Sequence, residues 1–395
     1  MNTQDRVLIA GAGPVGMVAA ASLVRQGVPV TVLEANAELS NESRASTFHP
    51  PTLDMLDRLG AARPLIAQGL IAPQFQYRNR REGLFAQFDF ATIADATTHP
   101  FRLQCEQSRL TRILLAQLQN EADFEIVFSS TVRGVTQSAD GVSVSLERDG
   151  RTESEAARFL IGADGARSET RASLGIDFEG FTWPERFLVV STPFDFHSVI
   201  KDLVHVNYVA DPQRWNFFLQ TPAAWRIMFP IGADESDELA LSREFAQSLM
   251  ATLVPGIDRY EITHTTLYRV HQRVAATFRK GRAFLIGDAA HINNPLGGMG
   301  MNGGIHDAIN LTDRLAAVWH GAKPESELDR FDKQRRLVTK EYVEKQSIQN
   351  KKNLEAPGTE FRDRLTAIAA DAAKTREYLL AVSMISSLRR AQELG

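Results

Sequence analysis

The chain has 395 residues, of which 44% are hydrophobic and 23% charged, so a packed protein of two or three domain-sized units is expected rather than disorder. The formal net charge is −4 with both signs mixed, which excludes the charge pattern of a nucleic-acid-binding protein or of a polybasic membrane patch. One cysteine, Cys105, excludes an intrachain disulfide and is compatible with a reducing cytoplasm.

Residues 7–24 carry no charge, but glycines and a proline interrupt them, unlike a signal peptide or a membrane span. We predict a buried strand over 6–10, a turn over 11–16, a helix over 17–26 and a second strand over 30–33. Together these elements form one βαβ unit.

The turn of this unit carries the pattern Gly11-x-Gly13-x-x-Gly16. Gly11 permits the tight turn, Gly13 lets the backbone approach a pyrophosphate, and Gly16 lets helix and strand pack closely. The helix N-terminus adds free N–H groups and a partial positive charge. Glu34 ends the second strand, where a carboxylate accepts hydrogen bonds from a ribose diol and repels a 2′-phosphate. The unit therefore predicts FAD or NAD as ligand, rather than NADP.

Further along the chain, helices are predicted over 52–70 and 107–120 from their apolar spacing. Strands over 125–128 and 131–137 follow, with hairpin turns at Asp140-Gly141 and Asp149-Gly150, and then a buried strand over 159–162. Residues 181–275 alternate aromatic and β-branched residues with turn signals, which predicts a mostly antiparallel sheet. Short strands within 73–100 are candidates for the same sheet. A buried strand is predicted over 283–287, and the chain is mainly helical from 304 onward.

Two later motifs fit a flavin nucleotide. Gly287-Asp288 follows the predicted strand, where the aspartate can hold a sugar-like hydroxyl chain or cap the next turn. A glycine-rich stretch over 295–304 precedes a helix predicted over 305–320, and such a helix N-terminus stabilises negative charge on a reduced flavin ring. Taken by itself, a third motif, from Asp164-Gly165 to Arg171, predicts only a turn and the start of a helix.

In this order the motifs resemble those of the single-component flavoprotein aromatic hydroxylases, the para-hydroxybenzoate hydroxylase family, over residues from about 5 to about 320. The family's fingerprints are GxGxxG, DGxxSxxR and a late GD followed by a proline and a glycine-rich turn, and all three are complete here. Residues 44–52 look most like the phenol, nitrophenol and hydroxyphenylpropionate hydroxylase branch. Met299 departs from that branch, which often has glutamine there.

The resemblance implies an α/β fold with an α+β second domain: a Rossmann-like FAD-binding domain with a β-meander, an antiparallel substrate-binding sheet and C-terminal helices. We expect the FAD-binding domain over 1–72, 101–180 and 276–330. The substrate-binding sheet is expected over 73–100 and 181–275, and a helical segment over 331–395.

The resemblance also implies residue roles. Arg44 would lie near the flavin and the incoming nicotinamide, and Gln107 would touch the flavin. The Pro295 carbonyl would face the substrate hydroxyl, while Met301 and Asn302 would lie against the pyrimidine side of the ring. The expected FAD-binding residues are Gly11, Gly13, Pro14, Val15, Gly16, Glu34, Ala35, Arg44, Gln107, Val132, Asp164, Gly287, Asp288, Pro295, Gly298, Gly300, Met301 and Asn302.

The implied reaction is hydroxylation of a phenolic or related electron-rich ring with NAD(P)H and O2, through a flavin C4a-hydroperoxide that must be kept from water. Aromatic strands are expected to wall the substrate pocket. The candidates are Tyr77, Tyr208, Phe218, Arg226 and Met228. The expected catalytic residues are Tyr77, Tyr208, Arg226 and Pro295. Arg226 either binds a substrate carboxylate or nitro group or extends from the sheet into solvent.

Several alternatives stay open at this stage. The chain could act on a polycyclic or quinone-type substrate with the same fold, or be a decarboxylating hydroxylase, a flavin oxidase or a non-catalytic FAD-binding protein. The complete DGxxSxxR motif argues against the oxidase, and the intact turn over 297–303 against the non-catalytic protein. His49 and His291 are either proton relays or hydrogen-bonded structural histidines. The sequence leaves open the substrate, NADH versus NADPH, and the oligomeric state, a homodimer included.

Overall fold

A six-stranded sheet forms the core of the first half of the molecule, in the order β18-β19-β12-β1-β2-β8. The computed structural model describes residues 5–42, 45–211, 213–345, 348–349, 354 and 359–394. The strands β1, β2 and β12 are buried along their whole length, as expected for parallel strands with both faces covered. The strands of this sheet are β1 (Val7–Ala10), β2 (Val30–Leu33), β8 (Phe124–Val127), β12 (Phe159–Gly162), β18 (Arg279–Lys280) and β19 (Ala283–Leu285).

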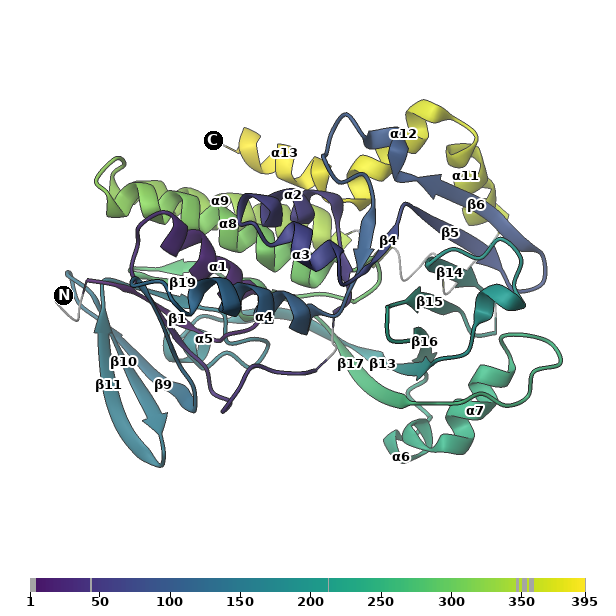
Figure 1. Ribbon diagram of the computed structural model, residues 1–395, viewed down its shortest axis with the longest axis horizontal. Helices are drawn as coiled ribbons and strands as arrows, with labels where there is room; N and C mark the ends of the chain where they lie inside the picture. Colours follow the sequence, from purple (N-terminus) through teal and green to yellow (C-terminus); the bar gives the residue numbers. More distant parts are fainter. Residues whose placement is uncertain are drawn as a thin grey trace.

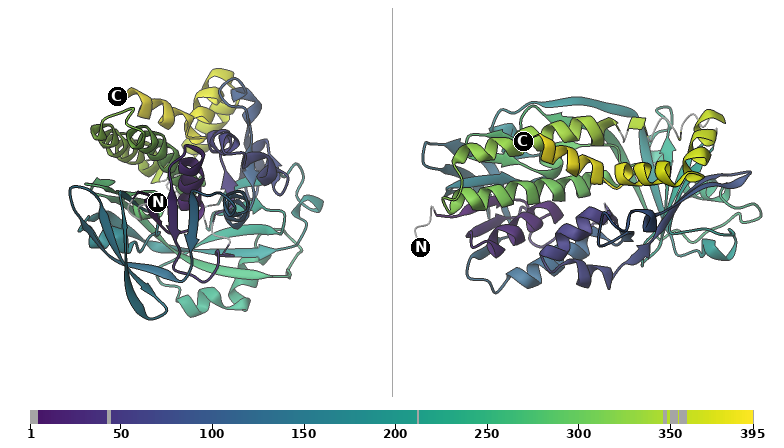
Figure 2. Two further views of the ribbon diagram at one scale, coloured as in Figure 1. Left: turned by 60° about the vertical axis from the view of Figure 1, so that its left-hand side comes forward. Right: turned by 90° about the horizontal axis from the view of Figure 1, so that it is seen from above.

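Helices cover one side of this sheet, and a three-stranded meander lies on the other (Figures 1 and 2). The meander turns at Asp149 and Gly150, both with positive φ, which is the geometry of a tight hairpin. The covering helices are α1 (Pro14–Arg25), α2 (Pro50–Arg58), α3 (Ala62–Ile66), α4 (Gln107–Leu118), α8 (Met299–Trp319) and α9 (Asp329–Val338). The opposite side holds β9 (Ser130–Gln137), β10 (Val142–Arg148), β11 (Arg151–Ala157) and the short helix α5 (Glu169–Ser173).

The second half is an eight-stranded sheet in the order β20-β17-β13-β16-β15-β14-β5-β6. The early strand β5 pairs in parallel with β14, so the candidate strands within 73–100 do join this sheet. The long strands β13 and β17 run back toward the first sheet (Figure 1). The strands are β5 (Gln74–Asn79), β6 (Gly83–Asp89), β13 (Phe178–Thr192), β14 (Val206–Ala210), β15 (Asn216–Gln220), β16 (Trp225–Ile231), β17 (His264–Ala275) and β20 (His291–Ile292).

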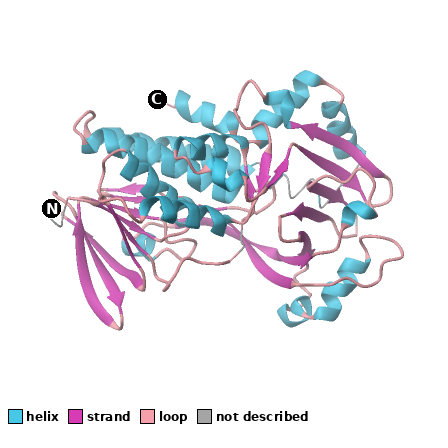
Figure 3. Ribbon diagram, viewed as in Figure 1, coloured by secondary structure: helices cyan, strands magenta, loops and turns pink. Residues whose placement is uncertain are grey.

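The two faces of this sheet have separate cores, because side chains alternate along each strand. On β16, Ile227 and Phe229 belong to the core shared with α6 (Asp237–Leu241) and α7 (Arg243–Ala251), whereas Met228 belongs to the opposite core. That opposite core also contains residues of α11 (Thr359–Ala369), α12 (Ala372–Val382) and α13 (Ile385–Glu393). The C-terminal helices therefore cover the face that carries Tyr77 and Tyr208. Figure 3 shows helices packed against this part of the sheet.

Between the two halves lies a small sheet in the order β3-β7-β4 (Figure 1). Its strands are β3 (Thr47–Phe48), β4 (Leu70–Ala72) and β7 (Arg102–Gln104). Short turns complete the described chain: η1 (Phe90–Ile93), η2 (Phe196–Ser198), η3 (Gly287–Ala289), η4 (Glu325–Leu328) and the π-helical η5 (Thr339–Glu344). In the described part of the chain, no helix combines the length and apolarity that crossing a membrane requires.

Several expected elements have other bounds in the structure. The helix expected over 17–26 begins at Pro14, and the strand expected over 283–287 ends at Leu285. The helix predicted over 52–70 is two helices, because Gly60 takes a positive φ of 67° and turns the chain between α2 and α3. The helix predicted to begin at 305 begins at Met299. One of its early glycines, Gly304, is needed for packing: a Cβ on it would lie 2.6 Å from Cγ2 of Val15.

Candidate active site

Four motifs meet at one edge of the six-stranded sheet. The adjacent strands β19, β12, β1 and β2 lead, through at most one residue, into Gly287, Asp164, Gly11 and Glu34. Because β12, β1 and β2 are parallel to one another and β12 is parallel to β19, these residues all lie at the carboxyl ends. That edge is where open α/β sheets bind nucleotide ligands.

The glycines of the first turn are required for two different reasons. Gly11 has a φ of 101°, and a Cβ on it would lie 2.5 Å from the carbonyl oxygen of Ala163. A Cβ on Gly16 would lie 2.1 Å from the carbonyl oxygen of Gly11. Gly13 differs, since a Cβ there meets no atom of the described residues within 4 Å. Packing inside the protein thus explains Gly11 and Gly16, whereas open space beside Gly13 fits a pyrophosphate that approaches the backbone.

Two helix N-termini near this edge have no side-chain cap. Gly13 precedes α1 and Gly298 precedes α8, and neither helix has a side-chain hydrogen bond at its cap. The first-turn N–H groups of such helices are available to anions and electron-rich oxygens. Val15 at the start of α1 packs against Gly287 and Gly304, so the two helix starts and the η3 turn are neighbours. This arrangement fits FAD.

Glu34 is buried and already braces the turn. Its Oε2 accepts from the backbone N–H of Ala12 at 2.8 Å, and its Oε1 accepts from the N–H of Asn36 at 2.9 Å and from Asn36 Nδ2 at 2.6 Å. A carboxylate has about four acceptor positions, so capacity remains for a ribose diol. The neighbouring Ala35 is exposed.

The central motif ties two of the turns together. Asp164 accepts hydrogen bonds from Ser168 Oγ at 2.6 Å and from the N–H of Thr170 at 2.9 Å, which starts α5. Arg171 is buried, and its Nη1 donates to the carbonyl of Ala289 at 2.9 Å. The motif therefore anchors the η3 turn, on which Asp288 is exposed.

The turn before α8 is braced by buried polar groups. The Pro295 carbonyl accepts from the N–H of Gly298 at 2.9 Å, and the Pro295 ring is exposed. Asn302 is fully buried, and its Nδ2 donates to the carbonyl of Gly298 at 2.6 Å. His49 contacts the carbonyl of Gly297 through Nε2 at 2.8 Å. Burial, with Arg102 as the next contribution, lowers the pKa of His49 well below its usual value.

The remaining expected FAD residues are dispersed. Gln107 begins α4, and its backbone N–H donates to the Ala45 carbonyl at 3.1 Å. Val132 on β9 and Met301 on α8 are buried in the core of the first half. Arg44 lies outside the described residues.

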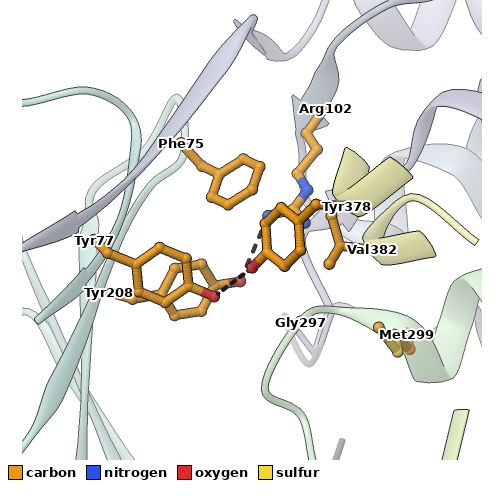
Figure 4. A pocket seen from close by; sticks show the side chains of 8 residues that line it. All are labelled: Phe75, Tyr77, Arg102, Tyr208, Gly297, Met299, Tyr378 and Val382. Atoms are coloured by element: carbon orange, nitrogen blue, oxygen red, sulfur yellow. Dashed lines mark hydrogen bonds between the residues drawn. The ribbon is translucent and has the colours of Figure 1, made fainter. Parts of the chain in front are cut away.

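A small cavity lies between the tyrosine-bearing face of the large sheet and the turn before α8 (Figure 4). In this conformation its free space is about 10 Å³, room for about one water molecule. The rings of Tyr77 and Tyr208 stack at 5.0 Å between centroids, and the hydroxyls of Tyr77 and Tyr378 lie 3.0 Å apart. The lining residues are Phe75, Tyr77, Arg102, Tyr208, Gly297, Met299, Tyr378 and Val382.

The cavity is aromatic, with one formal charge among its lining residues, on Arg102. Burial raises the pKa of Tyr77 well above 10, and it raises the pKa of Tyr378 to about 12. Both hydroxyls therefore stay protonated at neutral pH and can donate hydrogen bonds. Cys105 is also buried, and burial raises the pKa of its thiol to about 12, so it is no thiolate nucleophile at neutral pH.

The structure brings Tyr77 and Tyr208 together, but it places the other expected pocket residues elsewhere. Arg226 does not line the cavity, and its Nη1 donates to Ser46 Oγ at 3.0 Å. Phe218 packs on the opposite face of the sheet, beside Phe196. Met228 shares the core of Tyr208 without lining the cavity.

Sequence reasoning missed Phe75, Arg102 and Tyr378. Arg102 lies on a three-residue strand, and Tyr378 lies in the C-terminal helices, where the family resemblance was only general. The only signal in the sequence that could have marked Arg102 is weak: an arginine and a glutamine stand in β7, shortly before Gln107.

The comparisons with known proteins agree on one family. The model of the family described as "FAD binding domain" matches residues 4–346. Para-nitrophenol 4-monooxygenase from Pseudomonas sp. (strain WBC-3) is 33% identical over 98% of this chain and 98% of its own length. 6-Hydroxy-3-succinoylpyridine 3-monooxygenase from Pseudomonas putida (strain DSM 28022 / S16) is 33% identical over 96% of this chain and 98% of its own length.

A solved structure is similar over nearly the whole chain. The crystal structure of p-nitrophenol 4-monooxygenase from Pseudomonas putida DLL-E4 has a TM-score of 0.91 and 32% sequence identity. The match covers 98% of this chain and 99% of that one. The C-terminal helices, including the one that carries Tyr378, are therefore part of the shared architecture.

Proposed function

The chain belongs to the FAD-binding-domain family of flavoproteins, and from this premise we propose that it hydroxylates a single-ring phenolic compound in the cavity beside Tyr77 and Tyr208. It is an FAD-dependent monooxygenase of the aromatic hydroxylase type, with NAD(P)H as the reductant. A flavin oxidase and a non-catalytic FAD-binding protein, the two distant alternatives, do not fit these relatives.

We assign the FAD to the edge where the four motifs meet. The pyrophosphate would lie at the open side of Gly13 and the α1 N-terminus, with Glu34 toward the ribose. Asp288 would serve the ribityl chain, and the α8 N-terminus after Gly298 the flavin ring. FAD, when bound, takes two electrons from NAD(P)H and activates O2 for transfer to the substrate.

The protein's own part is to hold the ring and exclude water. The cavity walls are mainly aromatic, and their hydroxyls are neutral donors that can orient a ring oxygen. The Pro295 carbonyl retains one lone pair beyond its bond to Gly298 and can accept the substrate hydroxyl. Closure by Tyr378 and Val382 from α12 keeps water from the reacting ring.

The names of the two relatives that match over their full length support a single-ring substrate. Both full-length relatives are named for oxygenation at a substituted ring position, position 4 of para-nitrophenol and position 3 of 6-hydroxy-3-succinoylpyridine. In each compound that position is para to the ring hydroxyl, so we propose the carbon para to a hydroxyl as the site of oxygenation.

The observation that carries this proposal is the contact between the aromatic cavity and the Gly297–Met299 turn, which joins the substrate and flavin regions. The test is a panel of para-substituted phenols, polycyclic phenols and amines, in which consumption of NADH and of NADPH is followed and products are identified. We expect single-ring phenols to stimulate consumption and to yield hydroxylated products. Stimulation by polycyclic compounds alone would contradict the proposed substrate class.

A further inference from the structure

Arg102 stands at the wall of the cavity, almost fully buried. Only 3% of the surface of this residue is exposed, and its Nη1 lies 3.5 Å from the Tyr208 hydroxyl. The guanidinium carbon lies 4.6 Å from the centre of the Phe75 ring and 5.4 Å from that of Phe90. These two rings hold the guanidinium at the cavity wall, and Figure 4 shows one of them, Phe75, beside Arg102.

This buried cation has no acidic partner among the described residues. No carboxylate lies within ion-pair distance of it there, and its Nε donates no hydrogen bond. The equally buried Arg335 shows the usual solution in this chain, since its Nε lies 2.7 Å from Asp307 Oδ1. Burying an unpaired charge is costly, and contacts with aromatic rings offset only part of that cost. Such a group fits a ligand that brings its own negative charge.

The groups around Arg102 suit the same ligand. The hydroxyls of Tyr77, Tyr208 and Tyr378 lie near one another and toward Arg102 (Figure 4). Since the hydroxyls of Tyr77 and Tyr378 stay protonated, they add donors without adding negative charge. Among the described residues that line this cavity, none is acidic.

We propose that Arg102 binds an anionic oxygen carried by the aromatic substrate, with the tyrosine hydroxyls as neutral donors around it. The inference rests on the proposed function and assigns a charge to its substrate. That oxygen is either the ring oxygen, as a phenolate, or an oxygen of a substituent, which is anionic in a carboxylate and partially negative in a nitro group. Arg102 thereby takes the role that the sequence suggested for Arg226, which is bonded to Ser46 instead.

The test measures equilibrium binding to the FAD-loaded enzyme by the change in flavin absorbance. The probes are para-nitrophenol, para-nitroanisole, whose ring oxygen cannot ionise, and phenol, which lacks the nitro group. Arg102→Gln should weaken para-nitrophenol binding about 10- to 100-fold, the worth of one charged hydrogen bond. The matched control is Arg133→Gln, on the exposed surface of β9 where Arg133 pairs with Glu147, and it should bind like wild type.

The three probes separate the two sources of the anionic oxygen. If it is the ring oxygen, Arg102→Gln weakens binding of phenol and para-nitrophenol but not of para-nitroanisole. If it is the substituent, the variant weakens binding of the two nitro compounds but not of phenol. Unchanged binding of all three probes overturns the proposal. A wild-type enzyme that binds none of them overturns the proposed function instead.

A second measurement needs no variant and so does not depend on folding of Arg102→Gln. Wild-type enzyme is titrated with benzoate and with benzamide, which have nearly the same shape but differ in charge. We expect benzoate to bind at least about tenfold more tightly, because only benzoate brings an anionic oxygen to Arg102. Equal affinities would overturn the proposal.

Discussion

At the scale of single residues, two buried histidines, His49 and His306, are held in the neutral form. His306 shares a hydrogen bond of 3.0 Å with Thr52 Oγ1, and burial lowers its pKa to about 3. Arg335 lowers the pKa of His306 further, while Asp307 opposes it. The pKa of His49 is also held well below its usual value, by burial and by Arg102. Both histidines are therefore structural, neutral groups at neutral pH.

The first prediction concerns acid stability. In the unfolded chain a histidine binds a proton below about pH 6.5, but folded His306 does so only near pH 3. Stability is therefore full above about pH 6.5 and falls as pH decreases, by about 1.4 kcal/mol per pH unit for each such histidine. Urea unfolding between pH 7 and pH 5 should show this slope, and His306→Gln should remove about half of the contribution of the pair. His264→Gln, at an exposed position, should leave the slope unchanged.

The second prediction separates two glycines of the same turn. Gly13→Ala places its methyl group in open space, so the apoprotein should lose less than about 1 kcal/mol of stability. FAD affinity should nevertheless fall by about tenfold or more, because the methyl group occupies the proposed pyrophosphate position. Gly16→Ala instead forces a Cβ to 2.1 Å from the Gly11 carbonyl oxygen and should destabilise the apoprotein itself. Apoprotein unfolding and FAD titration measure the two effects, and normal FAD affinity of Gly13→Ala would refute the assignment.

At the scale of elements, a buried charge cluster joins η3, α8 and α9. Asp307 on α8 accepts three hydrogen bonds. Its Oδ2 accepts from His291 Nε2 at 2.7 Å and from the N–H of Gly287 at 3.2 Å, and its Oδ1 accepts from Nε of Arg335 on α9 at 2.7 Å. Burial alone would raise the pKa of Asp307, but His291 and Arg335 hold it below its usual value. The aspartate is therefore ionised and fixes the turn that presents Asp288.

The third prediction follows from this cluster. Asp307→Asn leaves Arg335 buried without a counter-charge, so we expect a loss of about 3–5 kcal/mol in unfolding free energy, with weaker FAD retention. The matched control lies on the same helix: Asp313 pairs with Arg58 at 3.4 Å on the surface, and Asp313→Asn should cost less than about 1 kcal/mol. Equal losses of unfolding free energy for the two substitutions in chemical denaturation would contradict the expected contribution of the buried cluster to stability.

The fourth prediction concerns α12, which closes the cavity with Tyr378. The ring of Tyr378 packs against the ring of Phe88, with 4.6 Å between the ring centroids. Tyr378→Ala should open the cavity to water, so that less product forms per NAD(P)H consumed. Tyr378→Phe keeps the ring and should retain more of this coupling, while Lys374→Ala on the exposed side of α12 should behave like wild type. Product and NAD(P)H are measured together, and full coupling in Tyr378→Ala would contradict the role of α12.

At the scale of the whole molecule, the sequence predicted what local pattern determines. The βαβ unit, the hairpin turns and the motif positions depend on neighbours within a few residues, so Gly11, Glu34 and Gly287 could each be placed at the end of a predicted strand. The family fold is confirmed by the similar solved structure. Helix boundaries were less accurate where glycine served tertiary packing, as at Gly304.

The cavity could not be predicted in the same way. Tyr77, Arg102, Tyr208 and Tyr378 come from four elements spread along the chain, and only the folded sheet and the C-terminal helices bring them together. An arginine on a short strand has no periodic pattern that marks it as buried. Its burial follows from long-range contact with Phe75 and Phe90, which single-sequence patterns do not encode.

The central claim is that this chain inserts one atom of O2 into a phenolic ring. The most direct test supplies the FAD-loaded enzyme with NAD(P)H, a para-substituted phenol and ¹⁸O2, and analyses the product by mass spectrometry. We expect hydroxylated product carrying one ¹⁸O atom, formed only when phenol, NAD(P)H and O2 are all present. Product whose new oxygen comes from water, or NAD(P)H oxidation that phenols do not stimulate, would contradict the account.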